Sequence, residues 1–278
     1  MSTVKTADGL ELYKHEWLVE SPKATVLIIH GYGEHGERYS HLASAFNEAG
    51  ISTLSADLRG HGRSPGVRGY VDRFNDYHLD ATALYENALE YAQGGPLFVF
   101  AHSMGGLICF DWLNAGLERP LSGVIVSSPC LGFALEVNAA KKMLGNVMSS
   151  LYPSLAIPSG LKGSDVTRDP DEAEAYDCDP LNNSKATARW FTETKEAMAR
   201  VHANAAGAVK CPIFLVYGGD DRVVSADDTE RFAKGLKVED QTVERLEGYF
   251  HELINEPEEY RKPIIERTRD WILARCNA

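Results

Sequence analysis

Short apolar runs that alternate with helical spacing constrain the fold of this chain more than any other feature. Residues 4–6 and 10–19, joined by an Asp8-Gly9 turn, have the spacing of a β-hairpin. Six later runs have the length of buried strands: 26–29, 51–55, 97–101, 124–127, 213–217 and 242–246. Strands that alternate with helices are typical of a parallel sheet covered on both faces. We therefore expect an α/β protein with a mostly parallel sheet of about eight strands.

Three segments between these runs carry the apolar spacing of amphipathic helices, at residues 39–49, 74–91 and 257–272. The first is followed by Gly50 and the second by Gly94, and glycine commonly follows the last turn of a helix. We expect each apolar stripe to pack in the core.

A long stretch separates the fourth and fifth of the six strands. It extends from about Pro129 to Ile213 and is far longer than an ordinary crossover connection. We expect residues 131–210 to form a cap, inserted into a core made of residues 1–130 and 211–278. Within it, Met143, Leu144, Val147, Met148 and Leu151 have the spacing of an amphipathic helix. Either this stripe packs on the core, or part of it stays open as an acyl-binding or membrane-touching face.

Charge and composition exclude several classes of function. The 278 residues carry a net charge of −12, which disfavours binding to nucleic acids and to anionic membranes. The five cysteines are scattered without C-x-x-C spacing, so they suggest neither a disulfide framework nor a zinc site. The first residues contain no apolar run of signal-peptide length. We expect a cytoplasmic protein that acts on small neutral substrates.

The segment Ala101-His102-Ser103-Met104-Gly105 is typical of a nucleophile elbow. It lies where an apolar strand meets a predicted helix, and small residues stand two positions to each side of the serine. Alanine replaces the usual first glycine, and its single methyl group can be fitted in such a turn. On its own, the pattern also fits a glycine-rich turn without a catalytic role.

A nucleophilic serine needs a histidine base, which in turn needs an acid to orient it. In α/β-hydrolases the acid follows a late strand and the histidine follows the last one. Asp221 fills the first position, with Asp220 as a rival, whereas Asp227 and Asp228 are expected to cap the next helix. His251 fills the second. A lone loop histidine is usually only solvated, but its place in this order favours a catalytic base.

The oxyanion formed in acyl transfer needs two fixed donors. The N–H of Met104, at the start of its helix, is one candidate. The N–H of Tyr32, in the glycine-containing loop after the strand 26–29, is the other. In the same loop, His30 and His35 are expected to be scaffold residues that hold it by hydrogen bonds.

The turn-rich segment 57–64 follows the strand 51–55. Its charged residues could bind substrate, but bracing of the loops beneath the site is the favoured interpretation.

Four separated stretches resemble one family. Residues 30–39 are similar to an H-G-x-G-E-H-x-x-R-Y oxyanion segment, and residues 57–64 to a D-x-R-G-H-G-x-S loop. Residues 101–106 are similar to G-H-S-M-G-G, with Ala101 as the departure, and residues 167–170 and 179–181 complete the match. Over nearly its whole length the chain resembles the monoacylglycerol lipase and lysophospholipase branch of the α/β-hydrolase superfamily.

This resemblance implies an α/β-hydrolase fold that uses neither a cofactor nor a metal. It implies a triad of Ser103, Asp221 and His251, with Tyr32 and Met104 as oxyanion donors. It also implies that Glu34 and Arg38 support the oxyanion loop.

The expected reaction is hydrolysis of a single-chain lipid ester, with monoacylglycerol as the preferred substrate. A lysophospholipase, a general carboxylesterase, and a peptidase or amidase on the same fold are the alternatives. A lipid carrier without catalysis is a further rival, although such a protein would not need all the triad residues. We expect transient contact with membranes or micelles through the cap.

Overall fold

Eight strands form one sheet in the structure, a computed structural model that describes residues 2–116, 120–134, 148–207 and 209–276. The strands are β1 (Thr3–Lys5), β2 (Glu11–Trp17), β3 (Ala24–Ile29), β4 (Ile51–Ala56), β5 (Leu97–His102), β6 (Gly123–Ser127), β9 (Ile213–Gly218) and β10 (Gln241–Leu246). Their order in space is β1-β2-β4-β3-β5-β6-β9-β10. Only the β1–β2 and β2–β4 pairs are antiparallel. The predicted hairpin and the mostly parallel eight-stranded sheet are both confirmed.

The middle of the sheet is buried on both faces. Every residue of β3, β4, β5, β6 and β9 is buried, as expected for parallel strands covered by helices on each side. Along β3, Leu27 and Ile29 point into one apolar cluster, whereas Val26 and Ile28 point into another. The edge strand β10 instead alternates exposed and half-buried residues.

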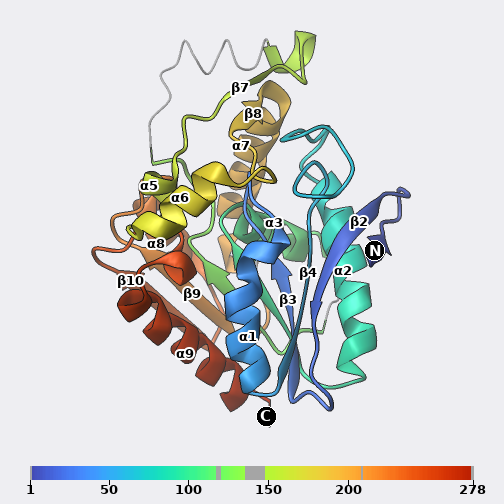
Figure 1. Ribbon diagram of the computed structural model, residues 1–278, viewed down its shortest axis with the longest axis vertical. Coiled ribbons are helices and arrows are strands. Elements are labelled where there is room, and N and C mark those ends of the chain that lie inside the picture. Colours follow the sequence, from blue (N-terminus) through green and yellow to red (C-terminus); the bar gives the residue numbers. More distant parts are fainter. Residues whose placement is uncertain (1, 117–119, 135–147, 208, 277–278) are drawn as a thin grey trace.

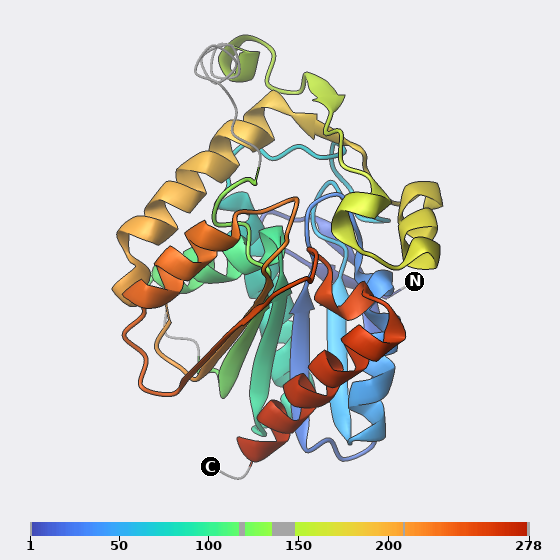
Figure 2. The same cartoon turned by 90° about the vertical axis from the view of Figure 1, so that its left-hand side faces the viewer.

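Helices cover both faces of the sheet (Figures 1 and 2). The helices α2 (Asp76–Ala92), α3 (Met104–Asn114) and α8 (Ala226–Gly235) contribute Leu84, Ile108 and Phe232 to one apolar cluster. On the opposite face, α1 (Ser40–Glu48) and α9 (Glu258–Ala274) contribute Phe46 and Trp271. A short 3₁₀ turn, η1 (Gly36–Tyr39), precedes α1, and another, η3 (Leu253–Asn255), precedes α9. The three helices predicted from apolar spacing are confirmed as α1, α2 and α9.

As far as the structure describes it, the chain between β6 and β9, called the insertion below, rises above the carboxyl ends of the parallel strands (Figure 1). Its described elements are β7 (Ala156–Pro158), α5 (Gly163–Val166), α6 (Pro170–Cys178), β8 (Lys185–Thr187), α7 (Ala188–Ala203) and the 3₁₀ turn η2 (Ala205–Gly207). The strands β7 and β8 pair with each other, and α7 packs against α3. Met143, Leu144 and Val147 of the predicted amphipathic stripe lie outside the described residues. Within the described ranges, no helix combines the length and hydropathy needed to cross a membrane.

Candidate active site

Ser103 occupies a sharp turn between β5 and α3. Its backbone has φ +53° and ψ −118°, a conformation that costs a residue with a side chain about 1–3 kcal/mol. Two hydrogen bonds hold the turn: the Ser103 N–H donates to the Ser127 carbonyl at 3.0 Å, and the Ser103 carbonyl accepts from the Cys130 N–H at 2.9 Å. The strained turn therefore has a fixed place at the carboxyl edge of the sheet.

Positions 101 and 105, on either side of Ser103, hold small residues for different structural reasons. A Cβ atom on Gly105 would lie 2.1 Å from the Ile29 carbonyl oxygen, so only glycine allows α3 to approach β3 this closely. Ala101 is fully buried in β5, where it is the register partner of Ile29 and Val126 on the two neighbouring strands. The alanine that departs from the elbow pattern thus lies in regular strand, where a methyl group fits.

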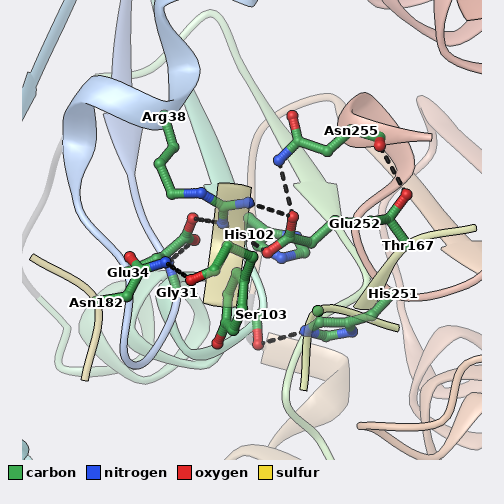
Figure 3. A network of polar contacts seen from close by, with 12 residues as sticks. Gly31, Glu34, Arg38, His102, Ser103, Thr167, Asn182, His251, Glu252 and Asn255 are labelled. Atoms are coloured by element: carbon green, nitrogen blue, oxygen red, sulfur yellow. Dashed lines mark hydrogen bonds and ion pairs between the residues drawn. The ribbon is translucent and has the colours of Figure 1, made fainter. Parts of the chain in front are cut away.

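His251 bridges Ser103 and Asp221. Its Nε2 atom lies 2.9 Å from Ser103 Oγ (Figure 3), and its Nδ1 atom lies 2.7 Å from Asp221 Oδ2. Because an ionised carboxylate only accepts hydrogen bonds, Nδ1 carries the proton and Nε2 is left to accept from the serine hydroxyl. The three side chains come from loops after β5, β9 and β10, which end at the same edge of the sheet.

The structure distinguishes between the two candidate acids. The second oxygen of Asp221 accepts hydrogen bonds from the N–H groups of Val223 and Val224, at 2.8 and 2.9 Å, and its side chain is fully buried. Asp220 is exposed and uses its backbone N–H to bind the Tyr249 carbonyl at 3.1 Å. Asp221, and not Asp220, therefore lies against the histidine.

The expected capping of α8 by Asp227 and Asp228 is wrong. Both residues lie in the first turn of the helix, and Ser225 is the cap, with its Oγ accepting from the Asp228 N–H at 3.1 Å. The serine is well placed to satisfy this N–H, whereas the two carboxylates favour the first turn through the helix dipole.

The surroundings of His251 favour its charged form. Burial disfavours the imidazolium, but the Asp221 carboxylate, followed by the charges of Glu252 and Glu34, outweighs burial and raises the pKa of His251 above its ordinary value. The ring of His102 lies 4.7 Å from that of His251. Burial, and next the nearby His251, lower the pKa of His102 to about 4, so at neutral pH it adds no charge.

The two predicted oxyanion donors come from different parts of the chain. Met104 is the first residue of α3, with its N–H at the positive end of the helix dipole. Tyr32 lies in the loop after β3. Within the part of the chain that the structure describes, neither N–H donates to a protein acceptor. Both are therefore available to an oxyanion, and this role remains a prediction.

A buried ion network supports the oxyanion loop. Glu34 Oε1 accepts from the Gly31 N–H at 2.6 Å and from the Tyr39 hydroxyl at 2.7 Å, while its Oε2 binds Arg38 at 2.9 Å. The Arg38 guanidinium also forms two parallel hydrogen bonds with Glu252, at 2.6 and 2.7 Å (Figure 3). The support predicted for Glu34 and Arg38 matches these contacts. Glu252 was missed, although its place directly after His251 was a signal.

The two scaffold histidines differ in their partners. His30 Nε2 accepts from the Leu58 N–H at 2.8 Å, and its Nδ1 lies 2.7 Å from the Gly31 carbonyl, so this side chain holds the oxyanion loop. His35 Nε2 lies 2.8 Å from Asp179 in the insertion. Sequence reasoning did not find this last contact.

The segment 57–64 braces the loops beneath the site. Asp57 is fully buried, and its Oδ1 accepts from the Gly36 N–H at 2.8 Å and lies 2.8 Å from His15 Nε2. Its Oδ2 accepts from the Arg63 N–H at 2.7 Å. These bonds use the carboxylate within the scaffold, as the favoured interpretation expected.

The insertion contacts both loops that form the site. The Asn183 N–H donates to the Gly33 carbonyl at 2.8 Å in the oxyanion loop, and the Glu252 N–H donates to the Val166 carbonyl at 2.8 Å. Thr167 Oγ1 donates to the Asn255 carbonyl at 2.7 Å (Figure 3). The insertion therefore fixes the histidine loop and the oxyanion loop relative to each other.

The sheet order, the strained serine turn and the Ser–His–Asp arrangement define an α/β-hydrolase. Comparison with known proteins narrows this class. The model of the hydrolase family described as serine aminopeptidase, S33, matches residues 20–258. A phospholipase, YtpA, of Bacillus subtilis (strain 168) is 31% identical over 91% of this chain and 96% of its own length. A monoacylglycerol lipase of Mycolicibacterium smegmatis is 27% identical, over 96% of this chain and 94% of its own.

A solved structure shows the same architecture. The crystal structure of Paleococcus ferrophilus monoacylglycerol lipase superposes with a TM-score of 0.85 at 28% identity, covering 95% of this chain and 99% of the other. The chain belongs to the serine aminopeptidase S33 family of hydrolases, in the monoacylglycerol lipase branch of the α/β-hydrolase superfamily.

Proposed function

We propose that this protein is a serine hydrolase that cleaves single-chain lipid esters, with a monoacylglycerol as its preferred substrate and glycerol and a fatty acid as products. The observation that carries the proposal is the position of His251, within hydrogen-bond distance of both Ser103 Oγ and Asp221 Oδ2. A histidine held in this tautomer is a base for the serine hydroxyl. The names of the lipase relatives support the substrate class.

In the proposed mechanism, His251 Nε2 takes the Ser103 proton as Oγ attacks the ester carbonyl. The N–H groups of Tyr32 and Met104 hold the oxyanion, and Asp221 stabilises the imidazolium that forms. His251 then gives its proton to the departing glycerol oxygen, leaving an acyl group on Ser103. A water molecule, deprotonated by His251, releases the fatty acid and restores the serine.

We also propose that the insertion acts as a cap that contacts lipid surfaces. Its tip exposes large apolar side chains: Leu151 is 66% exposed, Tyr152 63% and Ile157 58%. These residues lie in or next to β7, at the end of the molecule farthest from the C-terminus (Figure 1). An apolar surface above an esterase site suits transient contact with a micelle or a membrane in which the substrate is dissolved. The cap boundaries, 131–210, are part of this proposal.

Two alternative substrates have specific support. The similarity to a phospholipase favours a test on lysophospholipids, and the description of the family favours a test on aminopeptidase substrates. All these reactions use the same acyl-enzyme chemistry, so the leaving group must be identified by experiment.

The experiment is a panel of monoacylglycerols, lysophospholipids, p-nitrophenyl esters and aminoacyl p-nitroanilides, assayed with the wild-type protein and with Ser103→Ala. We expect kcat/KM to be highest for a monoacylglycerol and the activity to be lost in Ser103→Ala. Labelling by a fluorophosphonate should occur in the wild type only. Exclusive turnover of lysophospholipids or of the p-nitroanilides would contradict the substrate assignment, while activity in Ser103→Ala would contradict the mechanism.

A cytoplasmic location is a further proposal. It rests on the free thiols of Cys130 and Cys178, which suit a reducing compartment. Fractionation of the native cells, with detection of the protein in the cytosol or outside it, tests this location.

A further inference from the structure

One buried side chain of the insertion contacts both residues that supply the proposed oxyanion donors. Trp190 lies in the first turn of α7 and is 5% exposed. Its ring centroid lies 3.7 Å from that of Tyr32, with 33° between the two planes. Its indole N–H donates to the thioether sulfur of Met104 at 3.3 Å. Tyr32 lies in the loop after β3 and Met104 begins α3, and Trp190 joins them from a third element, α7.

The position of Trp190 is itself fixed. Thr187 caps α7, with its Oγ1 accepting from the Trp190 N–H at 3.3 Å and donating to the Gly69 carbonyl at 2.8 Å. These two bonds tie the first turn of α7 to the backbone at Gly69. The indole therefore projects from an anchored turn.

The side chain of Tyr32 is held through its ring and through its hydroxyl group. Besides the contact with Trp190, its hydroxyl donates to the Lys185 carbonyl at 2.7 Å. Next to it, the Asn183 N–H binds the Gly33 carbonyl, and a Cβ on Gly33 would lie 2.7 Å from the Asn183 carbonyl oxygen. Within the loop, Glu34 and His30 hold Gly31 on one side of Tyr32. The contacts of the Tyr32 side chain and of Gly33 with the insertion add the restraints on the other side, so we expect the orientation of the Tyr32 N–H to depend on both.

Met104 is held by a weaker but well-placed contact. Its side chain is fully buried, and the indole N–H of Trp190 approaches its sulfur within hydrogen-bond range. A thioether is a weak acceptor, so this bond adds little to stability. It does favour one side-chain conformation at the first residue of α3, the residue whose N–H is a proposed oxyanion donor.

We propose that Trp190 is a positioning residue of the oxyanion hole, which sets the two donor amides relative to each other through the side chains of Tyr32 and Met104. The inference rests on the proposed function, because it assigns a role within that mechanism. Oxyanion donors act only when they are fixed at hydrogen-bond distance from the developing charge. A small displacement of either amide thus affects the transition state far more than the binding of the substrate.

The test uses p-nitrophenyl butyrate, a short soluble ester that does not need a lipid surface. We expect Trp190→Ala to lower kcat by about 10–100-fold while KM changes by about twofold or less. Phenylboronic acid forms a tetrahedral adduct with a nucleophilic serine. Its inhibition constant should rise by about the same factor by which kcat falls.

The matched control is Val201→Ala. Val201 is fully buried on the same helix, eleven positions beyond Trp190 and thus about three turns away on the same face. This variant should lower the melting temperature and leave kcat near the wild-type value. If Trp190→Ala instead keeps kcat within about twofold, the proposal is overturned.

A second set of variants keeps the proposal testable if Trp190→Ala fails to fold. Trp190→Phe retains a ring against Tyr32 but removes the indole N–H, and Met104→Leu removes its acceptor with little change in volume. Each should lower kcat by about three- to tenfold, and the double variant should lower it no further, because both remove the same hydrogen bond. Additive losses, or none, overturn the proposal.

Ser103→Ala separates this inference from the proposed function. Loss of activity in Ser103→Ala together with an unchanged kcat in the Trp190 variants overturns the role of Trp190 alone. Activity that survives Ser103→Ala overturns the proposed function and this inference with it.

Discussion

The Arg38 guanidinium forms two parallel hydrogen bonds with the carboxylate of Glu252, the residue directly after His251. Arg38 belongs to η1, next to the oxyanion loop, and it also binds Glu34, which holds that loop. One buried cation therefore ties together the two loops on which the proposed chemistry depends.

Removing this cation should destabilise the protein strongly. Arg38→Met would leave Glu34 and Glu252 buried, close together and without their counter-ion. We expect the free energy of unfolding, measured by urea denaturation, to fall by about 3–5 kcal/mol. Arg63→Met is the control, since Arg63 pairs with Glu37 at an exposed position. A loss in Arg38→Met as small as in the control would contradict a structural role for the network.

The charge of Glu252 should contribute to the position of the acid limb of the pH–rate profile. Catalysis needs neutral His251, whose pKa lies above its ordinary value mainly because of Asp221 and next because of Glu252. Activity should therefore fall as the pH drops through a value above about 6.5. Glu252→Gln removes a negative charge, lowers the pKa of His251 and moves the acid limb of kcat/KM to lower pH. A limb that stays in place or moves to higher pH would contradict this electrostatic account.

Asp221 and Asp220 offer a matched pair of substitutions. Asp221→Asn removes the acceptor that fixes the tautomer of His251, and we expect kcat to fall by about 10³–10⁴-fold. Asp220→Asn changes an exposed neighbour and should keep kcat within about twofold. Steady-state kinetics on p-nitrophenyl butyrate measure both. Equal losses in the two variants would mean that the acid has been misassigned.

The small residues around Ser103 should differ sharply in their tolerance. Gly105→Ala places a Cβ against the Ile29 carbonyl, so we expect loss of folded protein or of activity. Ala101→Gly, which restores the usual motif, should instead cost about 0.5–1 kcal/mol of stability through the freedom of glycine in a strand. Its kcat should not rise. Thermal melts with parallel kinetics measure these effects, and a higher kcat in Ala101→Gly would show that the alanine distorts the turn.

Polar substitutions at the tip of the insertion should lower the turnover of aggregated substrate only. The double variant Leu151→Ser and Ile157→Ser removes two exposed apolar side chains from the proposed contact surface. Turnover of monoacylglycerol in mixed micelles should fall several-fold, whereas kcat/KM for soluble p-nitrophenyl butyrate should stay unchanged. A parallel fall on both substrates would assign these residues to the fold rather than to the lipid surface.

The fold was largely predictable because buried parallel strands appear as continuous apolar runs, of which β5 and β9 are clear examples. The order of Ser103, Asp221 and His251 along the chain placed them at one sheet edge, and the structure brings them within hydrogen-bond distance. The pairing of Arg38 with Glu252 was not predictable, since these residues lie 214 positions apart and no local pattern links them. The contacts of Trp190 were missed for the same reason.

The edge position of β10 has a consequence for how the protein loses activity. This strand pairs only with β9, its side chains are at most half-buried, and the loop that follows it carries His251. Edge elements of this kind open at a lower free energy than the interior of a sheet. Local unfolding of β10 would withdraw the base while Ser103 stays seated between β5 and α3. We therefore expect activity to be lost through opening of this edge before the core of the sheet unfolds.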